Sequence, residues 1–121
     1  MLDSIGQIAI LVQNMDRARA FYRDVLGLQH LFDAGPTLSF FQCGTVRLML
    51  SPPSAPEFDH HSSIVYYRVA DLAATHAALI AKGVPFEAGP HLVARTPTHE
   101  LWMAFLRDSE GNLLALMQEK R

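Results

Sequence analysis

The hydrophobic pattern of this chain occurs twice. An apolar run at residues 5–12 is followed by Asn14 and by a segment with helical spacing that ends at a glycine. A second run at residues 63–69 is followed by Asp71 and by another helical segment that ends at a glycine. The two copies lie about half a chain length apart. Since a duplicated half-domain normally has its functional cleft where the halves meet, the repeat predicts the place of a site.

The first half predicts one strand, one helix and three further strands. Residues 5–12 are apolar at nearly every position, which is typical of a central strand with both faces buried. Asn14 is a good N-cap, and Gly27 stops the helix that follows. The apolar stripe of this helix consists of Met15, Ala18, Tyr22, Val25 and Leu26. The three further strands are expected near residues 28–33, 37–42 and 45–51.

The second half predicts the same order. A strand at 63–69 leads to Asp71 as N-cap and to a helix that Gly83 ends. The stripe of this helix consists of Leu72, Thr75, Ala78 and Leu79. Strands are expected near residues 85–94, 100–107 and 113–119. In the turn before the last strand, Gly111 supplies a positive φ, and Asp108 and Asn112 can bond its backbone. The prediction is an α+β fold with two tandem βαβββ modules that form a curved mixed sheet around a cleft.

Length and composition fit one domain over residues 1–121, with module one at 1–51, a linker at 52–62 and module two at 63–121. At 121 residues, with 50% hydrophobic and 18% charged residues, the chain can bury a core and is not disordered. The net charge is -2, and no basic stripe supports binding to nucleic acid or to a membrane surface. Cys43, the single cysteine, allows no internal disulfide, and the N-terminus lacks a signal peptide's basic region. We therefore expect a cytoplasmic protein.

Two motifs resemble those of the vicinal oxygen chelate superfamily, which includes glyoxalase I, extradiol dioxygenases, fosfomycin-resistance proteins and bleomycin-binding proteins. Residues 20–28, AFYRDVLGL, look like the family's "FY...LG" helix end, and residues 108–114, DSEGNLL, are similar to its "DPDGN" turn. The resemblance covers nearly the whole chain and implies the fold and a homodimer. It does not imply a reaction, because the superfamily hosts several chemistries.

In metal-using members of this family, four residues from the first and last strands of the two modules hold a divalent cation. Counting from the shared motifs places these positions at Gln7, Met49, Ile64 and Ala115. Only Gln7 is a usual ligand type, since isoleucine and alanine offer no donor atom and a thioether is a soft, weak ligand. We therefore expect a protein of the metal-less branch, with no metal and no other cofactor.

Strand alternation then predicts which side chains share the face of these four positions. They are Ala9, Leu11, Arg47, Tyr66, Arg68, Leu113 and Met117. Arginines with a phenol and no carboxylate suit a small carboxylate or phosphate better than a bulky cationic drug such as bleomycin. The alternative is that Arg47 and Arg68 lie in solvent or pair with acidic residues.

The segment from His91 to Trp102 is a second candidate cluster. In the fosfomycin-resistance branch the corresponding loop contacts the substrate, so the resemblance implies that Arg95 and His99 contact a ligand. His99 is the best acid–base candidate because imidazole titrates near neutrality; the alternative is an exposed loop histidine. Trp102 is expected in the core or at a dimer contact.

The other histidines carry weaker signals. His60 and His61 are adjacent, so their side chains point apart, and we expect a solvated linker instead of a metal site. His30 and His76 have no evident partner in the sequence.

The leading hypothesis is a metal-independent protein that binds a small polar or anionic molecule in the inter-module cleft. Its predicted ligand-binding residues are Gln7, Arg47, Met49, Tyr66, Arg68, Arg95 and His99. One alternative is an isomerase- or lyase-type enzyme with His99 or Tyr66 as acid–base. Another is a partner-binding module whose cleft is vestigial.

Overall fold

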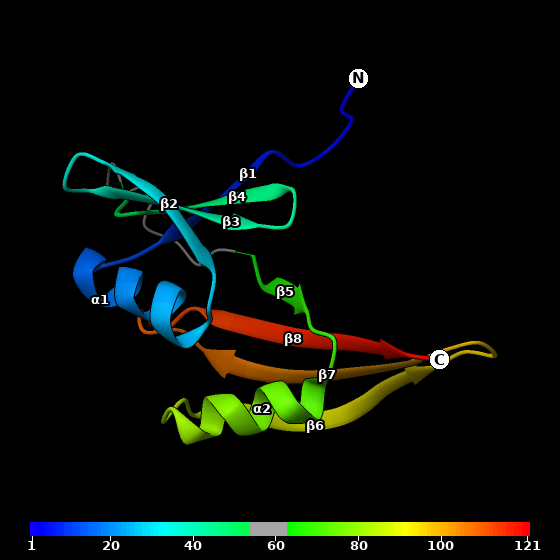
Figure 1. Ribbon diagram of the computed structural model, residues 1–121. Helices are drawn as coiled ribbons and strands as arrows, with labels where there is room; N and C mark the ends of the chain where they lie inside the picture. The colour runs from blue at the N-terminus through cyan, green and yellow to red at the C-terminus, as the bar shows by residue number, and fades with distance from the viewer. Residues whose placement is uncertain (54–62) are drawn as a thin grey trace. The chain divides into compact units, whose positions relative to one another are not determined.

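The computed structural model describes residues 1–53 and 63–121 (Figure 1). It divides into two compact units, Met1–Ser62 and Ser63–Arg121. The second unit begins where the second predicted module begins. Most of the predicted linker at 52–62 lies outside the described residues, and the assignment of residues 1–121 to one domain stays a prediction.

The described part of the first unit, residues 1–53, contains two helical segments and one four-stranded sheet. Its elements are β1 (Gln7–Leu11), α1 (Met15–Ala20), η1 (Phe21–Val25), β2 (Gln29–Ala34), β3 (Leu38–Cys43) and β4 (Val46–Ser51). The strand order is β1-β4-β3-β2, with β1 parallel to β4 and the other neighbours antiparallel. The prediction that residues 5–12 form a central strand is wrong for this sheet, because β1 lies at its edge and Gln7 and Ala9 are exposed.

The helical segment of the first unit begins as predicted and ends differently. The Asn14 side chain accepts a hydrogen bond from the Arg17 backbone N–H at 3.1 Å, which caps α1. Only the first turns are α-helical, and residues Phe21–Val25 form a π-helix. Gly27, with φ of 74°, comes shortly after this π-helix. The wider π-helical turn still directs Tyr22 into the core, where its ring centre lies 6.2 Å from that of Phe41.

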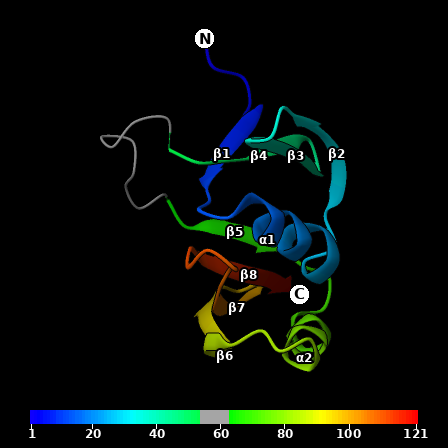
Figure 2. The ribbon, with the colours of Figure 1, turned by 90° about the vertical axis from the view of Figure 1, so that its left-hand side faces the viewer.

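The second unit repeats this arrangement. Its elements are β5 (Val65–Arg68), α2 (Leu72–Ala81), β6 (Phe86–Arg95), β7 (Glu100–Arg107) and β8 (Leu113–Lys120). The order β5-β8-β7-β6, with β5 parallel to β8, matches the order of the first sheet. In each unit the helix covers one face of its own sheet (Figure 2). The α+β class and the two βαβββ modules are thus confirmed.

Helix α2 is capped and packed nearly as predicted. The Asp71 side chain accepts from the Ala74 backbone N–H at 3.0 Å, and Leu72 and Leu79 are buried. The prediction for Ala78 is wrong, because this residue is exposed. A half-buried histidine, His76, packs toward the sheet instead, with its ring centre 4.5 Å from that of Phe86.

The predicted turn between β7 and β8 is confirmed in detail. Asp108 is buried, and its Oδ1 accepts from the backbone N–H groups of Glu110 and Asn112, both at 2.8 Å. Gly111 has φ of 84°, a backbone conformation that would be strained in a residue with a side chain. Among the described residues, no helix has the length and apolar character needed to cross a membrane.

Candidate functional site

The face of the second sheet turned away from α2 carries Tyr66 and Arg68. The Gln118 side chain accepts from the Leu72 backbone N–H at 2.8 Å, so this residue of β8 faces α2 and its neighbours in the strand face the other way. Tyr66 pairs with Ala115 in the register, and Arg68 pairs with Met117. The two predicted residues therefore share one face, as alternation indicated.

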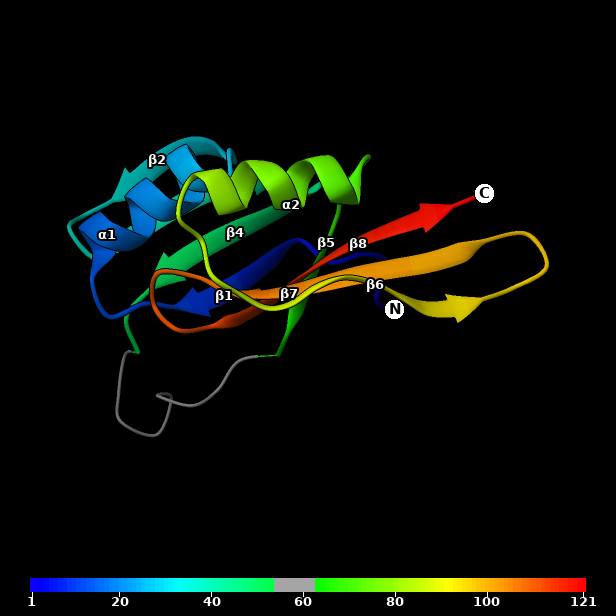
Figure 3. The ribbon, with the colours of Figure 1, turned by 90° about the horizontal axis from the view of Figure 1, so that it is seen from below.

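Arg68 lies at the wall of a cavity of about 410 Å³. The wall also includes His99, Gln118, Glu119 and Arg121. Figure 3 shows why these segments meet: the loop that joins β6 to β7 lies at the same end of the unit as the last residues of β8. The structure thus brings together Arg68 and His99, which are far apart in the sequence.

Glu119 corrects one prediction about this face. The predicted set contained no carboxylate, and this is wrong because Glu119, which lies within the predicted strand 113–119 and alternates with Met117, lies on the same side. Its Oε1 lies 3.9 Å from Nη2 of Arg68, and the two side chains are 47% and 77% exposed. Exposed pairs of this kind contribute at most about 1 kcal/mol. The alternative in which Arg68 pairs with an acidic residue describes the structure, but the pair is weak enough for an anion to replace the carboxylate.

A second cavity of about 360 Å³ lies at the loop between β6 and β7. Its wall includes Arg95, Thr98, His99, Glu100, Lys120 and Arg121. Nε and Nη2 of Arg95 lie 3.0 and 2.9 Å from one oxygen of Glu100. The hydrogen bond from the Trp102 indole, followed by that from Arg95, lowers the pKa of Glu100. Arg95 is therefore held by a carboxylate within the cavity wall.

His99 is held in place by the tight turn of this loop. The Thr96 backbone N–H donates to the His99 carbonyl at 2.8 Å, and the His99 backbone N–H donates to the Thr96 hydroxyl at 3.0 Å. The imidazole Nδ1 lies 2.7 Å from the Thr98 hydroxyl oxygen. His99 is half-buried and borders both cavities, so the exposed-loop alternative does not describe it.

Trp102 does not lie in the buried core. It is half-buried, its indole N–H donates to Glu100 at 3.1 Å, and the Lys120 ammonium lies 4.6 Å from its ring centre. Strand β7 begins two residues before Trp102, so one side of the ring meets polar side chains at the end of the neighbouring strand β8.

The first unit has its own group of predicted residues. Gln7, Arg47 and Met49 lie on the sheet face opposite to α1, as alternation indicated. The Gln7 carbonyl oxygen accepts from Nε of Arg47 at 2.7 Å, and its amide donates to the Met49 sulfur at 3.7 Å. The Arg47 guanidinium carbon lies 5.3 Å from the ring centre of Phe40. Both the oxygen and the nitrogen of the Gln7 side-chain amide therefore have a hydrogen-bond partner.

The four positions at which the resemblance implies metal ligands do not fit a divalent cation here. The Gln7 oxygen already accepts a hydrogen bond from a guanidinium group, whose positive charge disfavours a second cation. Ile64 and Ala115 carry no donor atom. In residues 1–53 and 63–121, no three side chains of His, Cys, Asp or Glu lie together as a metal site would require. His60 and His61 lie outside the described residues.

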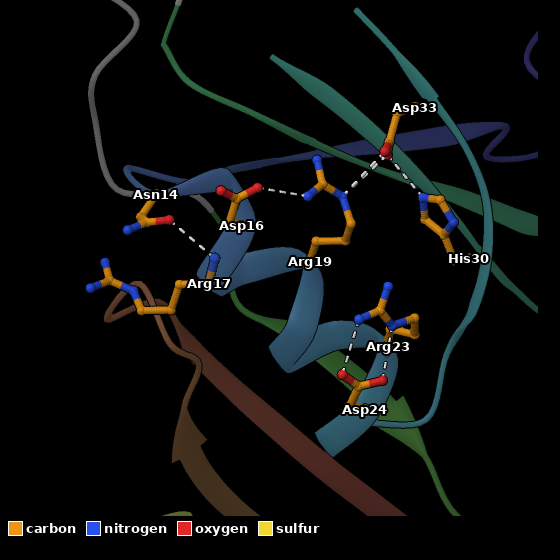
Figure 4. A network of polar contacts seen from close by, with 8 residues as sticks. All are labelled: Asn14, Asp16, Arg17, Arg19, Arg23, Asp24, His30 and Asp33. Carbon is orange, nitrogen blue, oxygen red and sulfur yellow. Dashed lines mark hydrogen bonds and ion pairs between the residues drawn. The ribbon is translucent and has the colours of Figure 1, made fainter. Parts of the chain in front are cut away.

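One polar network was missed by the sequence analysis. His30 Nε2 lies 2.9 Å from Oδ1 of Asp33, and the Arg19 Nε lies 3.3 Å from the same carboxylate (Figure 4). The buried Ser39 hydroxyl, then His30, lowers the pKa of Asp33. A bulge in β2 between His30 and Phe32 turns the side chains of His30 and Asp33 to the same face. No signal in the sequence marks this bulge.

Comparison with known proteins gives one family and many structures of the same fold. The family model described as "Glyoxalase/Bleomycin resistance protein/Dioxygenase superfamily" matches residues 4–116. No curated protein sequence matches the chain.

Three similar solved structures illustrate the range of proteins with this fold. The lactoylglutathione lyase from Agrobacterium tumefaciens is 24% identical, covering 97% of this chain and 94% of its own, with a TM-score of 0.76. TnmS3, an antibiotic binding protein from Streptomyces sp. CB03234, is 23% identical, covering 97% and 96%, with a TM-score of 0.76. A superfamily member from Sphaerobacter thermophilus DSM 20745 is 19% identical, covering 97% and 98%, with a TM-score of 0.78.

Proposed function

Because the chain belongs to the glyoxalase/bleomycin resistance protein/dioxygenase superfamily, as its two motifs indicated, we propose that it binds a small polar or anionic molecule without a metal ion. The observation that carries this proposal is the cavity of about 410 Å³ whose wall includes Arg68 and His99. A cavity of this size suits a small molecule.

The charge of the cavity wall supports an anion. Arg68 and Arg121 contribute two guanidinium groups, and Glu119 contributes one carboxylate. Guanidinium groups bind carboxylates and phosphates through paired, charge-assisted hydrogen bonds. A ligand anion replaces Glu119 at Arg68 at little cost, because the existing pair is long and exposed.

The proposal assigns a role to each predicted ligand-binding residue. Arg68 binds the anionic group, and His99 donates to the ligand. Tyr66 shares the sheet face of Arg68 but borders neither cavity, so its contact with the ligand stays a prediction. Gln7, Arg47 and Met49 of the first unit form a second contact surface, and that they border the same ligand stays a prediction. Arg95 is assigned an indirect role, since its guanidinium group pairs with Glu100.

The test is titration calorimetry with inorganic phosphate and with small carboxylates, on the wild type and on Arg68→Ala. Removing one charge-assisted contact is expected to weaken binding by about tenfold or more. Arg107→Ala is the matched control, because Arg107 is an exposed arginine of the same unit that pairs with Glu87 elsewhere on the sheet. Equal affinities of wild type and Arg68→Ala would contradict the proposal.

An enzyme of the isomerase or lyase type is the second candidate. It is favoured by the position of His99, whose ring is held by Thr98 while it borders both cavities. A lyase and an antibiotic binding protein share this fold, so the fold does not decide between binding and catalysis. His99→Gln separates the two functions, because it removes an acid–base group while its amide is close in size to the imidazole and can still donate a hydrogen bond. Binding retained with turnover lost would indicate catalysis.

The proposal also covers the oligomeric state, the location and the partners of the protein. We infer a cytoplasmic homodimer that binds neither nucleic acid nor membranes, which the net charge of -2 supports. Light scattering measures the oligomeric state, and a monomer at micromolar concentration would contradict it. A partner-binding module with a vestigial cleft is the third reading; it predicts that no small anion binds.

A further inference from the structure

Three aromatic rings lie together on the face of the second sheet that is turned away from α2. The centre of the Phe105 ring lies 6.1 Å from that of Tyr66, edge to face, and 6.1 Å from that of His91, at an angle of 27° between the ring planes. Tyr66 and His91 are exposed, and Phe105 between them is half-buried. Covering exposed aromatic surface with another aromatic or apolar group is favourable.

The register places Arg68 on the same face as these rings. Arg68 pairs with Met117, Met117 pairs with Met103, and Met103 pairs with His91. Residues that pair across neighbouring strands share a face, and Tyr66 lies two residues before Arg68 in β5. This row spans three strand spacings, which is about 14 Å and leaves room for one ring beside the arginine.

The surface between the arginine and the imidazole is apolar and adaptable. It consists of Met103 and Met117, which are both half-buried. A methionine side chain is flexible, and its sulfur packs favourably against the edge of an aromatic ring. These two residues therefore suit a ring that lies flat on the sheet.

The first cavity offers little apolar surface of its own. Besides Val69 and Ala70, its wall consists of charged and polar residues, among them Arg68 and Glu119. An anionic group is well placed at this wall, whereas an apolar group attached to it gains more on the neighbouring face with the methionines and the rings. Arg68 is thus the residue at which a polar site and an aromatic surface meet.

The His91 ring is held in its orientation by the backbone. Its Nδ1 donates to the Gly89 carbonyl oxygen at 2.7 Å, and a carbonyl oxygen only accepts, so Nδ1 carries a proton. The hydrogen bond keeps the imidazole beside Phe105. A ring that is already fixed loses little conformational entropy when a ligand covers it, so this surface is preorganised for a planar group.

We propose that the ligand of this site is an aromatic anion, a molecule in which a planar ring carries a carboxylate or a phosphate group. The anionic group binds Arg68, and the ring lies over the two methionines, in contact with Tyr66 and His91. This inference rests on the proposed function and names the class of ligand for it.

The experiment compares benzoate with cyclohexanecarboxylate, which has the same charge and nearly the same size but no aromatic ring. Both acids are ionised at neutral pH, and both are titrated calorimetrically into the whole chain. Benzoate is expected to bind about fivefold more tightly, which corresponds to one aromatic contact. Benzamide keeps the ring without the charge and is expected to bind about tenfold more weakly than benzoate.

Two variants locate the ring of the ligand. His91→Leu and Tyr66→Leu each replace an aromatic side chain with an apolar one, and each is expected to reduce the preference for benzoate to about twofold or less. His91 is exposed on the edge strand β6, so its replacement should leave the fold intact. Tyr66→Phe keeps the ring and should keep the preference. Phe86→Leu is the matched control, because Phe86 packs against His76 of α2 on the opposite face of the sheet.

The outcomes separate the two proposals. Equal affinities for benzoate and cyclohexanecarboxylate overturn the aromatic inference and leave the proposed function standing. A preference for benzoate that both leucine variants retain also overturns the inference, because the ring then binds elsewhere. If phosphate or an aliphatic carboxylate binds and benzoate does not, the inference fails alone. If no carboxylate and no phosphate binds to the wild type, both proposals fail.

Discussion

The rings of Tyr66 and Phe105 meet edge to face with their centres 6.1 Å apart, and Ala115 lies between them in the register of the second sheet. The alanine is completely buried although it lies on the face turned away from α2. Its small side chain allows the two rings to approach across the strand between them. Ala115 thus has a packing role at a position where the family resemblance implies a ligand in metal-using members.

Enlarging this residue is expected to separate the rings. Ala115→Leu adds volume under a formed aromatic contact and should lower the free energy of unfolding by about 1–3 kcal/mol. Urea denaturation measures the change. Met117→Leu, a swap of similar volume on the same face, serves as the control and should cost less than about 1.5 kcal/mol. A variant with leucine at 115 that is as stable as the wild type would show that the rings do not depend on the alanine.

Tyr66 can be tested separately for packing and for chemistry. Tyr66→Phe keeps the ring against Phe105 and removes the hydroxyl, so stability should be unchanged. Tyr66→Ala removes the aromatic pair and should cost about 0.5–1.5 kcal/mol beyond the loss of buried area. Thermal and urea unfolding of both variants give the comparison. If the phenylalanine variant is as unstable as the alanine variant, the hydroxyl group and not the ring stabilises this face.

The repeated fold could be predicted from the sequence because each of the signals that indicate it involves residues close together in the chain. Helix caps at Asn14 and Asp71 and the turn at Asp108 depend on residues a few positions apart, and all three are present in the structure. The edge position of β1 was missed because apolar residues occur in both central and edge strands. The π-helical turn after Ala20 was missed because its residues have ordinary helical spacing.

Only part of the candidate site could be predicted from the sequence. Alternation placed Tyr66 and Arg68 on one face, and the loop motif singled out His99. Glu119 lies within the predicted strand 113–119 and continues the alternation of Ala115 and Met117, so it could have been predicted in the same way. Arg121 follows the end of β8, and its place depends on the pairing of β8 with β7. The contact between His30 and Asp33 depends on a bulge, which shifts the register without leaving a mark in the hydrophobic pattern.

The network around Asp33 makes stability depend on pH. Its pKa in the folded protein lies below the ordinary value because Ser39, His30 and Arg19 favour the charged form. A carboxyl group with a lowered pKa stabilises the fold above its unfolded pKa of about 4, and that contribution is lost as the pH falls through the folded pKa. Asp33→Asn should therefore be less stable than the wild type at pH 7, and the difference should shrink below about pH 4.

Urea unfolding at several pH values between neutral and acidic conditions measures this difference. Asp16→Asn is the matched control, since Asp16 contacts the same Arg19 at 2.9 Å but its side chain is 97% exposed. An exposed pair contributes little, so this variant should follow the wild type at every pH. A gap between wild type and Asp33→Asn that stays constant down to the lowest pH would contradict a role for the ionised carboxylate.

The four family positions for metal ligands are not expected to bind an ion in this protein. Gln7 is the one usual ligand type among the four family positions, and its oxygen accepts from Arg47 at 2.7 Å. We therefore expect protein purified without a chelator to contain no stoichiometric divalent ion at these positions, as measured by elemental analysis. Adding Zn²⁺ or Mn²⁺ should leave the melting temperature unchanged, because a ligand that binds the folded state would raise it. The variant Gln7→Ala decides the meaning of any ion found: a stoichiometric ion that this variant loses would contradict the prediction, whereas an ion that it keeps binds elsewhere on the chain.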